Sequence, residues 1–389
     1  MLQTPYVVML GVLAAELAFF GVVASRPDLS KRLSEKGVTV SPFVILIDMG
    51  RVPRFRRLSS SRKFKVGALA AGLVNFGVML FLFYWQVLPA LYRIISSVFV
   101  TGAPHARSPF IPVIPGVTIG IQSFIYLLLA LSVGVAFHEL MHAIVAYAQG
   151  WRVEAWGVGV LFIFPLAYVR PSEEDYNKAP LKAKAAVLTA GILANTILFL
   201  IAMGLTPIVA AQVQTAVTVV SLVRNPSAPA VKAGLPAPSM LISINGTRIG
   251  SIGELQKYLY PIYPKNVTLD IRLCRAKIIG GLVKPVGPPQ DYIVRKPAGS
   301  KIGILVTQMP LYNTSPVALY ASRFLFWLGI VNISLSLINA APLYISDGGK
   351  LVAEALRGRA PSWVNHLIQG GTVVATIVLL AIGFMNFVR

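Results

Sequence analysis

Six long apolar segments dominate this 389-residue chain and limit what it can fold into. A helix that crosses a bilayer needs about 20 largely apolar residues. The segments that qualify are 5–24, 67–91, 117–148, 185–211, 317–341 and 364–387. Only 13% of the residues are charged and 56% are hydrophobic, which leaves too little polar surface for a water-soluble globule. The sequence therefore predicts a polytopic α-helical membrane protein with about six transmembrane helices.

The net charge of +21 is spread over short segments between the apolar runs. This distribution is typical of cytoplasmic loops that face anionic lipid, and it argues against a nucleic-acid partner. The longest basic segment lies between the first two apolar runs, so we expect the N-terminus outside the cytoplasm and its first span retained. Counting crossings places 149–184 and 342–363 on the cytoplasmic side. We expect a multi-pass protein, in the plasma membrane.

The interval 212–316 differs from the rest of the chain because apolar and polar residues alternate within it, at 215–221 and 267–273. Alternation of this kind predicts strands. The interval resembles a PDZ domain of the bacterial protease type, which implies an inserted extracytoplasmic α+β domain that binds a peptide C-terminus. We expect its Gly- and Pro-rich part, 279–300, to be an inserted loop. The segments that carry the resemblance are 225–235, 240–246 and 253–259.

The third apolar segment ends in the pattern H-E-x-x-H, with His138, Glu139 and His142. On a helix, positions four residues apart share a face, so both histidines can reach one metal ion. Glu139 lies beside them and can take a proton from a metal-bound water. Ionisable groups inside a span are expensive to bury and usually functional, which favours a zinc site over a structural pair of histidines.

A catalytic zinc ion generally takes three protein ligands and keeps a fourth position for water. The third ligand must lie at the depth of the two histidines. The fifth apolar segment carries polar residues and leads into 339–349, where Pro342 and the paired glycines at 348 and 349 break the helix and Asp347 lies between them. Glu173 and Glu174 are alternatives, as in membrane zinc proteases whose site opens to a soluble compartment.

Two further motifs accompany H-E-x-x-H: Gly191 with Asn195 on the next span, and N-x-x-P-x-x-x-x-D-G from Asn339 to Gly348. Together the three resemble the site-2 protease family of intramembrane zinc metalloproteases. The resemblance implies that His138, His142 and Asp347 hold one Zn²⁺ per chain and that Glu139 is the general base. It implies regulated intramembrane proteolysis of single-span membrane proteins, with the active site towards the cytoplasmic side.

A tetrahedral oxyanion needs a hydrogen-bond donor, and a neutral amide is cheaper to bury than a cation. Asn195 is the candidate donor, and Asn339 is a second one. The segment 151–169 follows the zinc helix and is rich in Val, Phe, Trp and Tyr, but Gly and Pro interrupt it. We expect a membrane-associated β-hairpin whose edge pairs with an extended substrate.

These predictions divide the chain into five parts. The alternative function is a membrane scaffold or receptor that binds peptides through the PDZ-like domain and cuts nothing. The parts are two N-terminal spans with a basic loop (1–91), the first catalytic part (117–211), the PDZ-like domain (212–316), the second catalytic part (317–363) and a C-terminal span (364–389).

Overall fold

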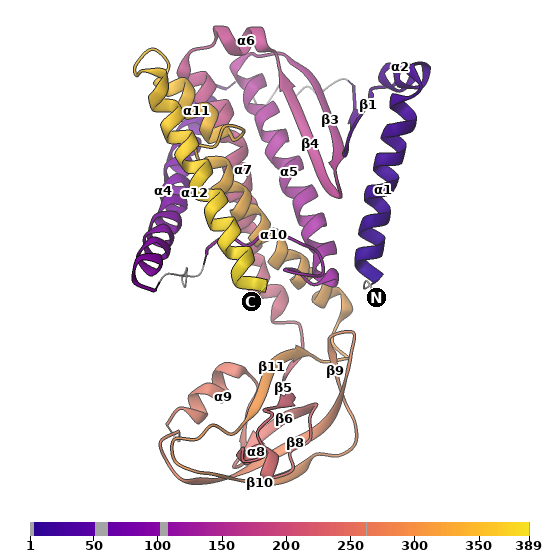
Figure 1. Cartoon of the computed structure of the whole chain (residues 1–389), viewed down its shortest axis with the longest axis vertical. Coiled ribbons are helices and arrows are strands. Elements are labelled where there is room, and N and C mark those ends of the chain that lie inside the picture. Colours follow the sequence, from indigo (N-terminus) through magenta and orange to yellow (C-terminus); the bar gives the residue numbers. More distant parts are fainter. Residues whose placement is uncertain (1–3, 51–60, 102–107, 262, 389) are drawn as a thin grey trace. The chain divides into compact units, whose positions relative to one another are not determined.

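The computed structural model describes residues 4–50, 61–101, 108–261 and 263–388. It forms two compact units, Met1–Gly204 with Arg323–Arg389, and Leu205–Ser322. The elements of the first unit are α1 (Thr4–Ala24), α2 (Pro27–Glu35), β1 (Val38–Ser41), β2 (Val44–Asp48), α4 (Arg62–Thr101), α5 (Ile121–Gln149), β3 (Val153–Leu161), β4 (Phe164–Pro171), α6 (Glu173–Lys178), α7 (Leu181–Ala210), α10 (Pro316–Ala340), α11 (Asp347–Leu356) and α12 (Ser362–Val388), where α7 and α10 continue into the second unit (Figure 1).

Five helices of the described residues are long and apolar enough to cross a membrane: α4, α5, α7, α10 and α12. The first predicted span is a helix as well, but Leu10–Ala24 meets Pro27–Glu35 at a bend of 103°. The described part of the chain thus contains five such helices, or six if the bent pair is one span. Residues 51–60 of the predicted basic loop lie outside the described residues.

Helix α7 is the most buried of the five, with 67% of its apolar window inside the molecule against 22–28% for the others. Its inward side is rich in Ala, Gly and Thr, and small residues let neighbouring helices approach closely. Ile192 at its centre is fully buried and packs with Met79 of α4 and Ala340 of α10. Helix α7 therefore stands where side chains from several spans can meet.

The predicted hairpin is present as β3 and β4, but it is half of a larger sheet. Strands β1 and β2, from the basic segment before α4, extend it in the order β1-β2-β3-β4, all antiparallel. The sequence analysis did not predict these two strands. As a result β2 covers the outer edge of β3, and β4 is an edge strand that packs against α5 (Figure 1).

A sharp connection joins α10 to α11 and places Asp347 at the first position of α11. Ser346 caps this helix: its hydroxyl accepts from the Gly349 amide at 3.0 Å and donates to the Ala341 carbonyl at 2.5 Å. A Cβ at Gly348 or Gly349 would collide with the backbone carbonyl of Ala340 or Leu343, respectively. The glycines after Asp347 thus allow the close approach of two backbone segments.

The second unit is built on a seven-stranded sheet with the path β10-β8-β6-β5-β11. Both predicted strands are present, and Asn245 and Gly246 both have positive φ in the turn after β6. The segment 279–300 is not a plain loop as predicted, because it contributes β9 and β10. The elements are β5 (Thr215–Leu222), α8 (Pro229–Lys232), β6 (Ser239–Ile244), β7 (Thr247–Arg248), α9 (Ile252–Leu259), β8 (Val267–Ile279), β9 (Leu282–Pro285), β10 (Gln290–Lys296) and β11 (Ile304–Pro310).

Candidate metal centre

Three side chains from two distant parts of the sequence converge beside α7. His138 and His142 lie one turn apart on α5, and Asp347 begins α11. The Asp347 Oδ2 atom lies 3.0 Å from His138 Nε2 and 3.1 Å from His142 Nε2, and the two Nε2 atoms are 3.1 Å apart. All three residues are buried, and they form a group that can hold a metal ion. The structure thus brings together the three predicted ligands.

The spacing of the three atoms fits a tetrahedral zinc ion. Ligand atoms about 2.0 Å from zinc lie about 3.3 Å from one another in a tetrahedral arrangement, close to the separations observed here. The His142 Nδ1 atom lies 2.7 Å from the Val187 carbonyl oxygen, which can only accept a hydrogen bond. Neutral His142 therefore turns the lone pair of Nε2 towards the Asp347 carboxylate. A lone pair facing a carboxylate is unfavourable without a cation between them.

Gly191 of α7 keeps the space beside the ligand atoms open. A Cβ built at this position would lie 2.5 Å from Nε2 of His138 and 2.5 Å from Nε2 of His142, closer than real Cβ contacts allow. Glycine is unusual in the interior of a buried helix because it lowers helix stability. Its presence here leaves room at the two nitrogen atoms that a metal ion would contact.

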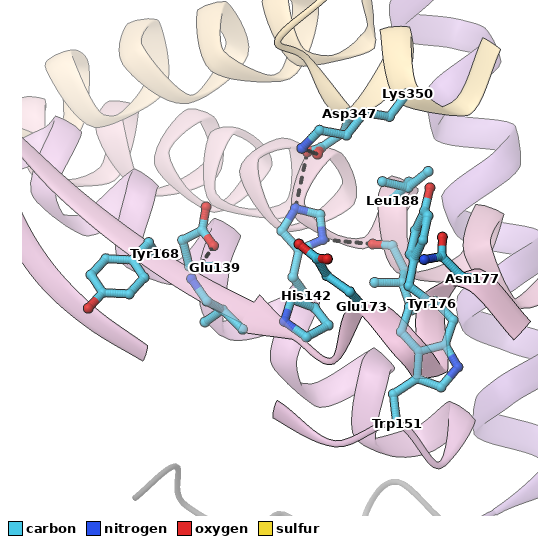
Figure 2. A pocket seen from close by; sticks show the side chains of 13 residues that line it. Glu139, His142, Trp151, Tyr168, Glu173, Tyr176, Asn177, Leu188, Asp347 and Lys350 are labelled. Atoms are coloured by element: carbon cyan, nitrogen blue, oxygen red, sulfur yellow. Dashed lines mark hydrogen bonds and ion pairs between the residues drawn. The ribbon is translucent and has the colours of Figure 1, made fainter. Parts of the chain in front are cut away.

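Glu139 lies on the hairpin side of the centre. Its Oε2 atom accepts a hydrogen bond from the Val169 amide of β4 at 2.9 Å. Figure 2 shows Glu139 beside the β4 ribbon, and Asp347 joined to His142 by a dashed line. Glu139, His142 and Asp347 line a cavity of about 560 Å³, together with Trp151, Tyr168, Val169, Pro171, Glu173, Tyr176, Asn177, Val187, Leu188 and Lys350.

The two predicted asparagines occupy different positions. Asn195 of α7 is fully buried, and its Nδ2 atom lies 3.1 Å from His138 Nδ1. Asn339 of α10 is half-buried and donates from Nδ2 to the Leu335 carbonyl, one turn earlier in its own helix, at 3.1 Å. Asn195 thus touches a candidate ligand, whereas the hydrogen bond of Asn339 stays within α10.

The rival third ligands lie elsewhere. Glu174 forms ion pairs with Arg152 at 2.8 Å and Lys178 at 2.6 Å, and its side chain is 58% exposed. Glu173 is exposed at the cavity wall. Hydrogen bonds from Lys178 and then Arg152 lower the pKa of Glu174, and the Arg152 guanidinium lowers that of Asp175. Through their ion pairs with Arg152, Glu174 and Asp175 connect α6 to the start of β3.

Sequence reasoning missed a buried charge cluster at the far end of α11. Lys184 of α7 and Glu354 of α11 form an ion pair at 2.9 Å, with side chains only 6% and 9% exposed. Arg357 adds a second cation to Glu354 at 3.0 Å. Burial, and then the Glu354 carboxylate, raise the pKa of Tyr176 to about 12, so the phenol stays protonated. A lysine at the start of an apolar span was the available signal.

Comparison with known proteins agrees with this geometry. The model of peptidase family M50 matches residues 126–382. A protein of Methanocaldococcus jannaschii whose name states no function is 26% identical over 71% of this chain and 68% of its own length. A protein of a Nostoc species, named "putative zinc metalloprotease", is 25% identical over 67% of this chain and 93% of its own. A protein of Lactococcus lactis with the same description is 24% identical over 57% of this chain and 60% of its own length.

Proposed function

The chain belongs to peptidase family M50, the site-2 protease family, and we propose that it is an intramembrane zinc endopeptidase. Its substrate would be a membrane-anchored protein, cut within or near a single transmembrane segment. One observation carries the proposal: His138, His142 and Asp347 converge at the end of an apolar span, with Glu139 beside them on a cavity. Three such ligands can hold a catalytic zinc ion, and a carboxylate beside it can serve as the general base of a metalloprotease.

Zinc held by the three side chains would polarise the scissile carbonyl and make a bound water acidic enough to attack at neutral pH. In this proposal Glu139 takes the proton from that water and passes it to the leaving amide nitrogen. The hydrogen bond from the Val169 amide holds one carboxylate oxygen of Glu139 and leaves the other for this exchange. The base is thereby tied to the hairpin.

Strand β4 is the proposed docking site for an extended substrate. The Val169 amide points off the free edge of the sheet, towards Glu139. Alternate residues of a strand point the same way, so Pro165, Ala167 and Pro171 share this edge. Proline has no amide hydrogen, which suits an edge position and limits the pairing groups to a short stretch around Ala167. A substrate segment unwound from its helix can pair there and lie along the cavity.

The partners and location follow as parts of the proposal. The apolar helices make the chain an integral membrane protein. We place it in the plasma membrane, with the N-terminus and the second unit outside and the active site towards the cytoplasm. The second unit, as a PDZ-like domain, would bind peptide C-termini and restrict which substrates enter.

The decisive experiment uses the full chain purified in detergent, with a tagged single-span substrate. Glu139→Gln should retain about one zinc per chain and lose cleavage by at least about 100-fold, because an amide cannot accept the proton. Metal analysis and a gel-based cleavage assay measure the two properties separately. A zinc chelator should abolish wild-type cleavage, and added zinc should restore it.

The matched control is Glu154→Gln, an exposed carboxylate on β3, which should leave both properties unchanged. Cleavage by Glu139→Gln at a rate near wild type would remove Glu139 as the base. A purified wild-type chain that binds no zinc would overturn the proposed chemistry altogether.

A further inference from the structure

The hydrogen bond on the far side of His142 fixes which of its nitrogen atoms is free for a metal ion. The Val187 carbonyl accepts from Nδ1–H at 2.7 Å, so in the neutral ring Nε2 carries the lone pair. Histidine ligands generally depend on such a second partner, which sets the tautomer and the ring orientation. His138 has the same requirement, because its Nε2 atom is the one that faces Asp347.

The partner at His138 Nδ1 is the side-chain amide of Asn195, at 3.1 Å. With its Nδ2 in this place, Asn195 donates, Nδ1 must accept, and the ring hydrogen sits on Nε2. That hydrogen would point into the space between the three ligand atoms and exclude a metal ion. In the same orientation Asn195 Oδ1 is buried and has no hydrogen-bond partner among the described residues.

A half-turn of the Asn195 amide removes the conflict at the ligand. The two ends of an asparagine amide have nearly the same shape, and their assignment follows from the hydrogen bonds around them. After the turn, Oδ1 accepts from His138 Nδ1–H, and Nε2 presents its lone pair beside that of His142. The buried amide atom without a hydrogen-bond partner is then Nδ2 instead of Oδ1. An unpaired N–H there is less harmful to metal binding than a hydrogen on His138 Nε2, which would block the ligand atom.

Three residues of α7 then form a regular series. Val187, Gly191 and Asn195 are spaced by four residues, so they share one face of the helix. Val187 contacts His142 Nδ1, Gly191 leaves space at both Nε2 atoms, and Asn195 contacts His138 Nδ1. The series runs antiparallel to the two histidines of α5.

We propose that Asn195 is a positioning residue, whose Oδ1 accepts from His138 Nδ1–H and thereby aims Nε2 at the metal. This assignment rests on the proposed zinc function and replaces the oxyanion role predicted from the sequence. Asn195 is fully buried, and the described residues that line the cavity do not include it. The contact of its amide with His138 Nδ1 at 3.1 Å is the observation that places Asn195 behind the ligand.

Two substitutions at this position separate the roles, because aspartate keeps the acceptor and leucine has none. In the full-length protein, Asn195→Leu should weaken zinc binding by about 10- to 100-fold, the usual effect of losing such a partner. Asn195→Asp should bind zinc with an affinity near that of the wild type and keep most of the cleavage activity. Competition with a chromophoric chelator measures affinity, and the absorption spectrum of the cobalt-substituted protein reports the ligand geometry.

The control is Asn332→Leu, the same change at another fully buried asparagine, whose amide donates to the Leu328 carbonyl at 2.8 Å. It should leave zinc affinity and the cobalt spectrum unchanged, and thermal unfolding of each variant checks its fold. Wild-type zinc affinity in Asn195→Leu would overturn the positioning role. Loss of cleavage in both Asn195 variants with zinc retained would favour an oxyanion donor, and a wild-type chain without zinc would overturn the proposed function instead.

Discussion

Helix α11 carries two buried carboxylates, two turns apart, whose surroundings differ in one respect. Glu354 is matched within the chain by two cations, Lys184 at 2.9 Å and Arg357 at 3.0 Å. Asp347 faces the ring nitrogens of His138 and His142 at 3.0 and 3.1 Å. The nearest lysine to Asp347 is Lys350, at 3.8 Å and with a side chain 55% exposed.

Burial of an unpaired charge is costly, so each carboxylate needs a cation. Glu354 has its cations already, and its cluster joins α11 to α7 without any added group. Asp347 meets two side chains that are metal ligands when neutral, and the zinc ion of the proposed function would supply its cation. The comparison therefore predicts that Glu354 is a structural carboxylate and that Asp347, on the same short helix, is a metal ligand.

The largest effect is expected at Asp347. Asp347→Ala removes a charged ligand and should weaken zinc binding by at least about 100-fold, more than the loss of an outer partner. Glu354→Gln, which keeps hydrogen-bonding groups beside Lys184, is the matched control and should retain zinc. Zinc measured by mass spectrometry after dialysis distinguishes the two. Stoichiometric zinc in Asp347→Ala would show that Asp347, like Glu354, is not required to hold the metal.

An intermediate effect is expected at Gly191. The added methyl of Gly191→Ala would lie 2.5 Å from both Nε2 atoms and push the histidine rings apart. We expect zinc affinity to fall by about 10- to 100-fold, as for other changes that disturb ligand orientation. Gly204→Ala, on the same helix but with nothing within 4 Å of the added carbon, should leave affinity unchanged. Equal affinities in the two variants would show that the centre tolerates the extra carbon.

The smallest effect on zinc is expected at Lys184, where the consequence is for stability. Lys184→Met leaves Glu354 with the exposed Arg357 and the Tyr176 hydroxyl as partners, and breaking a buried pair typically costs about 3–5 kcal/mol. The double variant Lys184→Met with Glu354→Met should recover most of that loss. Thermal unfolding in detergent measures stability, and zinc content should stay near wild type throughout. A Lys184→Met protein that unfolds as wild type but lacks zinc would reverse the roles given to the two clusters.

Local periodicity made half of the centre predictable. The spacing of His138 and His142 places them on one helix face wherever that helix lies, and long apolar runs locate the spans. Asp347 was one of three candidate third ligands, suggested by the break after the fifth apolar segment, and only the family motif favoured it over Glu173 and Glu174, because no local rule connects it to residues more than 200 positions earlier. The Val187 contact could not be predicted, since a backbone carbonyl leaves no mark in the sequence.

The missed features depend on tertiary context. Lys184 and Glu354 are 170 positions apart, and only packing of α7 against α11 makes them a pair. Strands β1 and β2 are short and lie in a segment that its positive charge marked as a loop. Their alternating Val, Ile and Thr residues were a usable signal. Strands β9 and β10 were hidden by the glycines and prolines of their turns.

The order of strands in the β1-β2-β3-β4 sheet determines where another polypeptide can pair with its edges. An exposed strand edge can pair with any extended chain, both with a substrate and with an unrelated chain in aggregation. Here β2 occupies one side of the hairpin, and the outermost strand beyond it, β1, has only four residues and packs against α1 and α2. The eight-residue β4 is the longer remaining edge, and it borders Glu139. Strands β1 and β2, which leave β4 as the longer edge, precede residues 126–382, the part of the chain that the family model matches.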